Sequence, residues 1–564
     1  MPQNLPTDGS AIARVTWTDL EPHYAALEGV ALDDQNVATW LADWSKVERV
    51  AREASSRLSV ATTVNTADSE AETALNVYLD ELYPQVSAAG QRLKEKLLAS
   101  GVVPADFEIP LRNMRAEAAL FRESNLPLLG EEQKLGMEYD KITGAQTVTW
   151  EGEEKTLAAM GPLQTHADRA VRESAWRMTM DRWQQDRAAI NALWARFLTL
   201  RLQVSDNAGF GNDFRAYQWQ RFQRFDYSPD NCREFQAAIE TVVKPAAARV
   251  LERRRQRLGL DTLRPWDLAV DTSGQPPLAP FATDTELSDK TATIFAKLDP
   301  ALSQFFTTMQ TDGLLDLGNR LNKAGGGYCT EFAVAGVPFI FMNAVGLHSD
   351  VQTMLHEAGH AFHVFESAHL PYVHQQNVNT EFAEVASMSM ELLGAPYLLP
   401  AFYTPTEAAR ARIEHLEHGL LFWPYMAVVD AFQHWVYENP TLSVDAAECD
   451  AEWSRQWDRF MPVVDWTGLE AEKATGWHRK LHIHQIPFYY VEYGLAQLGA
   501  YQVFANSLTD PALALSQYRS ALALGGTKTL PELFAAAGAK FAFDAETVTR
   551  AVNLIETTID QLSG

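Results

Sequence analysis

One stretch near the middle of the chain, residues 351–365, constrains the fold most because it defines a helix with two different faces. Apolar side chains recur along it at steps of four, three, four and three, at Val351, Leu355, Ala358, Phe362 and Phe365. His356, His360 and His363 form a second row, which at about 100° per residue lies well over about 90° from the first. We therefore predict an amphipathic helix that packs on a core with one face and borders a cavity with the other.

Two of these histidines belong to a His-Glu-x-x-His pattern, which predicts a zinc hydrolase. Residues four apart lie one turn apart on a helix, so the imidazoles of His356 and His360 can converge on one metal ion. Glu357 would then flank the open coordination position and act as general base toward water. His363 lies about 10.5 Å along the helix from His356, so we expect it to contact the site or to pack, and not to be a ligand. The alternative is a helix that carries two histidines without a metal.

Gly359 lies inside this pattern and weakens the helix by roughly 1 kcal/mol relative to alanine. That cost is understandable if another backbone or a substrate approaches closely at this position. A catalytic zinc also needs a third protein ligand besides the two histidines. Residues 379–393 form a second predicted helix, and its carboxylates Glu381, Glu384 and Glu391 are the candidates. Spacing alone does not choose among them, and an isolated glutamate also suits a solvated helix face.

An aromatic cluster near the end of the chain, residues 482–494, packs two histidines and three tyrosines into a dozen residues. Pro487 suits a first helical turn, so Tyr489 and Tyr493, four residues apart, would share a face. Phenol and imidazole groups are donors of the kind that stabilise the oxyanion of a tetrahedral intermediate. The alternative is that this aromatic helix simply belongs to the core.

Residues 323–332 combine three glycines with a short aromatic and β-branched run and continue to residues 338–343, which predicts a turn into a strand. The glycines do not form a phosphate loop, because the Gly-Lys-Ser/Thr ending is absent. Residues 147–153 are predicted to form a small hairpin, whereas residues 40–100 and 165–203 have the composition of long antiparallel helices.

The sequence HEAGHAFH, followed 28 residues after its first histidine by the Glu of FAEVASMSMELL, resembles the thimet-oligopeptidase-like zinc metallopeptidases, in particular their oligoendopeptidase F branch. The resemblance implies one zinc ion per chain held by His356, His360 and Glu384, with Glu391 as a carboxylate that supports a ligand. It implies oxyanion donors at His484, Tyr489 and Tyr493. It also implies substrate contacts at Tyr328, Tyr490 and His482.

The same resemblance implies a mainly α-helical, two-lobed metallopeptidase with a small β-sheet near the active site and a deep substrate channel. Such an enzyme hydrolyses internal bonds of short, unstructured peptides. Two alternatives stay open, a dipeptidyl carboxypeptidase of the same fold and a peptide-binding protein without hydrolytic activity. We place an N-terminal helical region over residues 1–200 and the catalytic region over residues 201–564.

Composition restricts the partners of the chain. Its net charge of −26, from 47 basic and 73 acidic residues, removes the attraction that nucleic acids and anionic membranes require. No apolar run approaches the ~18 residues of a membrane span, and the polar start of the sequence does not resemble a secretory signal. Three widely spaced cysteines fit a reducing compartment. We therefore expect a soluble cytoplasmic enzyme, with an oligomeric state that the sequence does not predict.

Overall fold

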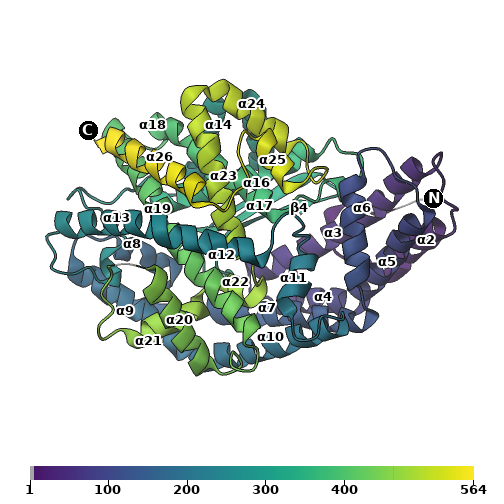
Figure 1. Cartoon of the computed structure of the whole chain (residues 1–564), viewed down its shortest axis with the longest axis horizontal. Coiled ribbons are helices and arrows are strands. Elements are labelled where there is room, and N and C mark those ends of the chain that lie inside the picture. Colours follow the sequence, from purple (N-terminus) through teal and green to yellow (C-terminus); the bar gives the residue numbers. More distant parts are fainter. Residues whose placement is uncertain (1–4, 462, 564) are drawn as a thin grey trace.

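The computed structural model describes residues 5–461 and 463–563 and is mainly helical (Figure 1). The long helical stretches predicted from the sequence are present as consecutive shorter helices. The first comprises α3 (Val37–Val64), α4 (Ser69–Val77), a π-helical turn (Tyr78–Leu82) and α5 (Tyr83–Ser100). The second comprises α9 (Arg169–Gln185) and α10 (Arg187–Asn207). One break is explained by Asp68, whose carboxylate caps α4 by accepting the backbone N–H groups of Glu70 and Ala71.

Most of the buried apolar residues belong to two clusters. The first lies between α2 (Trp17–Glu28), α3, α5 and α6 (Glu108–Leu120), drawn in purple and blue at the right of Figure 1, and its buried residues run from Ile12 to Met114. The second begins at Leu120 and extends to Ile559. The domain boundary near residue 200 stays a prediction, and the change of cluster between Met114 and Leu120 places the separation of the cores earlier in the chain.

The other long helices surround and build the second cluster. They are α7 (Leu126–Gly144), α11 (Phe214–Arg221), α12 (Pro229–Ala238), α13 (Lys244–Arg257), α14 (Asp284–Leu298), α15 (Pro300–Thr311), α16 (His348–Ser367), α17 (Thr380–Gly394), α19 (Pro405–Glu438), α20 (Ala446–Phe460), α23 (Tyr490–Thr509), α24 (Pro511–Leu522), α25 (Leu530–Ala536) and α26 (Ala545–Ser563). Among them α17 packs against both α16 and α23, near the centre of the molecule (Figure 1).

Two small sheets account for the strands of the described chain. The predicted hairpin is β1 (Thr147–Trp150) paired with β2 (Glu153–Thr156), and its turn residues Glu151 and Gly152 have φ angles of 51° and 87°. The second sheet has the order β3 (Leu315–Gly318), β5 (Val337–Ala344), β4 (Tyr328–Phe332). β4 is the strand predicted after the glycine-rich turn; it is antiparallel to β5 and occupies an edge of the sheet.

The loop between β5 and α16 is held by hydrogen bonds to a single carboxylate. Asp350 accepts the backbone N–H groups of Val345, Gly346 and Leu347 at 2.8, 2.9 and 2.8 Å. These groups belong to the loop that leads into α16 and to its N-cap residue, Leu347. α16 therefore begins at a fixed position directly behind the sheet.

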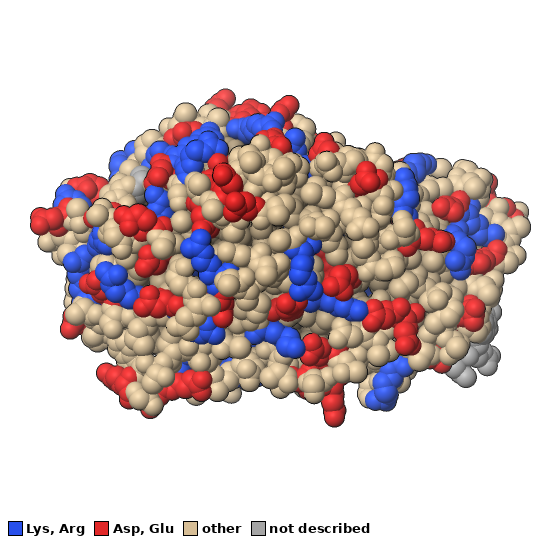
Figure 2. All heavy atoms as spheres, turned by 90° about the horizontal axis from the view of Figure 1, so that it is seen from below, with Lys and Arg blue, Asp and Glu red and all other residues tan. Residues whose placement is uncertain are grey.

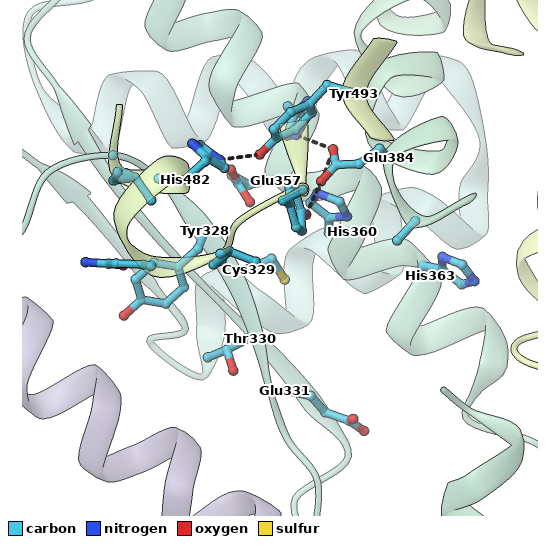
Figure 3. Close-up of a pocket in the computed structure, with 18 of the residues that line it drawn as sticks. Tyr328, Cys329, Thr330, Glu331, Glu357, His360, His363, Glu384, His482 and Tyr493 are labelled. Atoms are coloured by element: carbon cyan, nitrogen blue, oxygen red, sulfur yellow. Dashed lines mark hydrogen bonds and ion pairs between the residues drawn. The ribbon is translucent and has the colours of Figure 1, made fainter. Parts of the chain in front are cut away.

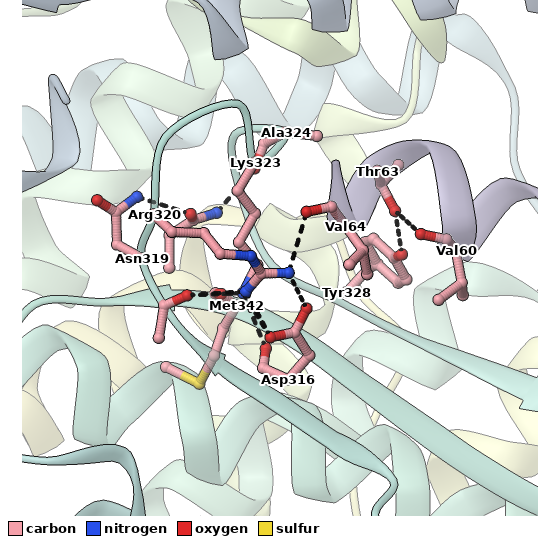
Figure 4. Close-up of polar contacts among 12 residues, drawn as sticks. Val60, Thr63, Val64, Asp316, Asn319, Arg320, Lys323, Ala324, Tyr328 and Met342 are labelled. Carbon is pink, nitrogen blue, oxygen red and sulfur yellow. Dashed lines mark hydrogen bonds and ion pairs between the residues drawn. The ribbon is translucent and has the colours of Figure 1, made fainter. Parts of the chain in front are cut away.

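Polar contacts join the end of α3 to the turn before β4 (Figure 4). The Lys323 ammonium donates to backbone carbonyls in β3 and β5 and lies 3.2 Å from the carboxylate of Asp316. Arg320 donates to the carbonyl of Val64 at 3.0 Å and to the Asp316 carboxylate at 2.8 Å. The first hydrophobic cluster is thus tied to the small sheet by residues on both sides of the turn.

The surface seen from below carries acidic and basic side chains interspersed, without a large patch of one sign (Figure 2). In the part of the chain that the structure describes, no helix combines the length and the apolar character needed to cross a membrane.

Candidate active site

The predicted metal ligands come from two adjacent helices, His356 and His360 from α16 and Glu384 from α17. The Oε2 atom of Glu384 lies 3.2 Å from Nε2 of His356 and 3.6 Å from Nε2 of His360. Ligand atoms about 2.1 Å from a tetrahedral zinc ion are themselves about 3.4 Å apart. All three donor atoms lie within 4.8 Å of one another, so they can surround one such ion, which in a catalytic zinc site keeps a fourth position open.

Gly359 is what lets the two helices come this close. A Cβ atom at this residue would lie 2.5 Å from Cα of Ser387 and 2.7 Å from the carbonyl oxygen of Ala386, both in α17. Of the two explanations that the sequence offers for this glycine, the close approach of another backbone is the one observed.

The other two glutamates of α17, Glu381 and Glu391, have hydrogen-bond partners of their own. Glu381 accepts a hydrogen bond from the hydroxyl of Tyr227 at 2.6 Å and lies 3.4 Å from the guanidinium of Arg224, in a buried cluster.

The carboxyl of Glu384 is buried, which favours its protonated form. The charge of His360 and the hydrogen bonds from His356 and His360 nevertheless hold the pKa of Glu384 well below the ordinary value. Glu384 is thus ionised at neutral pH, as a metal ligand must be.

Glu391 contacts the predicted ligand His356 through the ring nitrogen that is not assigned to the metal. Its Oε1 lies 2.7 Å from Nδ1 of His356, and its Oε2 lies 2.8 Å from Nε2 of His415 in α19. A carboxylate at Nδ1 favours the tautomer that leaves the Nε2 lone pair free for a metal. The role implied for Glu391 matches this geometry. His415 is a further site residue that sequence reasoning missed, because no motif connects it with α16.

Glu357, the predicted general base, follows His356 in α16 and is buried. Its side chain is 5% exposed, and Oε2 has no hydrogen-bond partner among the described residues. Burial raises the pKa of this carboxyl, which the nearby His356 and His360 only partly offset. A raised pKa brings a carboxylate closer to the value that suits a general base near neutral pH.

These groups line a cavity of about 810 Å³ between α16, α17, β4 and the segment 481–493 (Figure 3). Tyr328 faces it from the edge strand, with its hydroxyl 2.6 Å from that of Thr63. His363 also lines the cavity and packs on Phe382, and neither of its ring nitrogens has a partner within the described chain. Burial lowers the pKa of His363 to about 3, so the ring is neutral.

Two tyrosines of the aromatic cluster reach the metal ligands with different partners. The Tyr489 hydroxyl donates to Oε1 of Glu384 at 2.6 Å, so its single proton orients a ligand and is not free for an oxyanion. Tyr493 instead lies 3.1 Å from Nε2 of His482. The structure therefore brings Tyr493 and His482 together as the polar pair facing the substrate side of the cavity.

His484 is not brought to the cavity, which corrects its assignment as an oxyanion donor. Its ring is fully buried and stacks on Tyr139 and Trp477, with centroids 4.7 and 5.7 Å away. The reason is the short helix α22 (Leu481–Gln485), on which residues two apart point in nearly opposite directions. His482 and His484 cannot both face the cavity, and His482 is the one that does.

Tyr490 lies outside the main cavity. Its hydroxyl accepts from the ammonium of Lys480 at 3.1 Å, and it lines a smaller neighbouring cavity. The structure therefore does not bring Tyr490 to the main cavity with Tyr328 and His482, with which the sequence grouped it as a substrate contact.

Comparisons with known proteins find one family and several similar structures. A family model described as Peptidase family M3 matches residues 163–552. PZ peptidase A, solved with an inhibitor, has a TM-score of 0.91 and 25% identity, covering 100% of this chain and 98% of its own. A structure described as an oligoendopeptidase F has a TM-score of 0.90 and 26% identity, with 99% and 98% coverage. A further oligoendopeptidase F structure, from Bacillus anthracis, shares the fold with a TM-score of 0.88, 22% identity and 97% coverage of both chains.

No curated protein matches the sequence. The family match and the similar structures confirm the resemblance drawn from the sequence, and the mainly helical fold class with it.

Proposed function

Because the chain belongs to peptidase family M3, we propose that it is a zinc-dependent oligoendopeptidase that cuts internal bonds of short, unstructured peptides. The observation that carries the proposal is the cluster of three ligand atoms within 4.8 Å of one another, next to the buried Glu357, whose Oε2 has no hydrogen-bond partner among the described residues. Zinc suits this His, His, Glu donor set, which leaves one position open.

His356, His360 and Glu384 would hold the ion, which when bound supplies a Lewis acid for the scissile carbonyl and for water. Glu357 takes a proton from the attacking water on its free Oε2. It later gives that proton to the nitrogen of the leaving amine, so that it ends the cycle ionised.

Tyr493 and His482 act on the carbonyl oxygen. The neutral imidazole of His482 carries one N–H proton and the phenol of Tyr493 carries one O–H proton. One of these two protons forms the hydrogen bond between the two side chains. With Nε2–H donating to the phenol oxygen, the Tyr493 proton is free to donate to the oxygen on which negative charge develops. Removing such a donor typically costs ~10²-fold or more in kcat.

The peptide class follows from the cavity. β4 is an edge strand whose residues 328–331 line the cavity, so its backbone can pair with an extended peptide. A compact protein does not offer an isolated extended backbone of this kind. The volume of about 810 Å³ falls within the range of ordinary ligand cavities, which supports short substrates.

Mass spectrometry of a mixed-length peptide pool tests the proposal. The zinc-loaded protein is compared with Glu357→Gln and with Glu123→Gln, which makes the same change at an exposed residue. We expect internal cuts with the wild type and Glu123→Gln, and almost none with Glu357→Gln at unchanged zinc content. Release of C-terminal dipeptides alone would indicate a dipeptidyl carboxypeptidase, and no cuts with any protein would indicate a binding function.

A further inference from the structure

A second cavity of about 270 Å³ adjoins the candidate metal centre. It shares His356, His482 and Tyr493 with the main cavity, so a molecule held at the metal can extend into it. Its remaining walls come from α17, α19, α23 and the segment before α22. Apart from these three residues, no side chain that lines this cavity touches the scissile carbonyl or the attacking water in the proposed reaction.

One charged group that faces this cavity has no partner of opposite charge among the described residues. Its one carboxylate, Glu391, already uses both oxygens for His356 and His415. The half-buried Lys480 donates to the Tyr490 hydroxyl, and its ammonium lies 4.7 and 5.1 Å from the ring centroids of Tyr490 and Tyr425. No ion pair within 4.0 Å connects this ammonium with a carboxylate of the described chain. A half-buried cation that lines a cavity and has no such carboxylate partner is only partly solvated, so it is suited to an anion from outside the protein.

The main cavity has the opposite character. Apart from the metal centre, its acidic lining residues are Asp140 and Glu331, and no lysine or arginine lines it within the described ranges. Residues 328–331 lead away from Glu384 along β4 (Figure 3). A peptide that crosses the metal centre thus meets acidic groups in one cavity and a cation in the other.

We propose that the second cavity binds the free α-carboxylate of a peptide, with Lys480 as its counter-ion and the Tyr490 hydroxyl beside it. The inference rests on the proposed function, because only a peptide held at the metal centre places its C-terminal end here. The site then fixes the direction of the peptide and sets the cut at a short distance from a free C-terminus. An acidic side chain offers the same chemistry, so the test includes it as a separate arm.

Equilibrium binding separates this inference from the hydrolytic proposal. One labelled peptide is prepared with a free C-terminus, with an amidated C-terminus, and with an amidated C-terminus plus a glutamate near it. Binding to zinc-loaded Glu357→Gln is followed by fluorescence anisotropy, alone and combined with Lys480→Met, Lys480→Arg or Lys297→Met. Lys297 is an exposed lysine of α14, so its replacement controls for the loss of net charge.

We expect the free acid to bind at least about tenfold more tightly than the amide, as a charge-assisted hydrogen bond allows. Lys480→Met should abolish this preference, Lys480→Arg should restore part of it, and Lys297→Met should leave it unchanged. Equal binding of acid and amide, or a preference that survives Lys480→Met, would overturn the inference. Recovery of tight binding by the glutamate peptide would assign the cavity to acidic side chains instead.

Turnover by the wild type then tests the other proposal separately. A binding preference without any cleavage would refute the peptidase and leave the carboxylate site standing. Cleavage of acid and amide with equal kcat/KM, at equal affinity, would refute the carboxylate site and leave the peptidase standing.

Discussion

Replacing Gly359 by alanine tests how closely α16 and α17 must approach for the ligands to converge. The new Cβ would stand 2.5 Å from Cα of Ser387 and 2.7 Å from the carbonyl oxygen of Ala386. Both are backbone atoms, so no side-chain rotation relieves the contact. Carbon atoms pack at about 3.5–4.0 Å, which requires the two helices to move apart by about 1 Å.

The stability effect of Gly359→Ala is small because two terms oppose each other. Overpacking typically costs about 1–3 kcal/mol, whereas alanine in a helix gains up to about 1 kcal/mol over glycine. The effect on the metal is larger. Glu384 lies on the helix that is displaced, and metal–ligand distances tolerate only about 0.2 Å. We expect weaker zinc binding and a fall in kcat/KM of about 10²-fold, typical of a 1 Å misplacement.

Zinc affinity is measured by chelator competition, and stability by thermal denaturation of the metal-free protein. Gly90→Ala in α5 is the matched control, because a Cβ there meets nothing within 4 Å. It should stabilise the protein slightly and leave zinc binding unchanged. A Gly359→Ala variant with wild-type zinc affinity and turnover would refute the argument that this glycine sets the position of Glu384.

Three further predictions concern single side chains. Glu391→Gln should weaken zinc binding by about 10–100-fold in the same competition assay, and an unchanged affinity would remove its supporting role. Tyr493→Phe should lower kcat by ~10²-fold or more, whereas His484→Gln should lower the Tm and leave kcat unchanged; the reverse result would restore His484 to the site. Burial raises the pKa of Asp140 from 3.8 to about 7, so the folded state loses stability as the pH rises from about 4 to 7. Asp140→Asn should remove this loss, with a gain of no more than about 4 kcal/mol at pH 8 in denaturant titrations, and equal pH profiles of the two proteins would contradict the shift.

Much of the site could be predicted from sequence because its chemistry is local. His356, Glu357 and His360 are fixed relative to one another by one helix, so their periodicity carries nearly all the necessary information. The cost of Gly359 in that helix pointed to a close approach, and the structure shows that α17 makes it. The choice of Glu384 over its neighbours needed more than periodicity, because the three glutamates of α17 differ only in what packs against each.

What the sequence could not supply depends on contacts between distant elements. His415 meets Glu391 only because α19 packs beside α17, and no spacing rule connects the two. Tyr489 and Tyr493 share a helical face as expected, yet their hydroxyls bond to different partners. His482 and His484 were separable in principle, since residues two apart on a helix diverge, but the length of α22 was not evident from the sequence.

The central claim is that one zinc ion is held by His356, His360 and Glu384. Anomalous diffraction at the zinc edge, from crystals of the zinc-loaded Glu357→Gln protein, tests it most directly. The account predicts a single strong peak about 2.0–2.2 Å from Nε2 of both histidines and from a carboxylate oxygen of Glu384. A peak coordinated by another glutamate of α17, or one at the buried group of Cys232, Asp430 and His434, would contradict it.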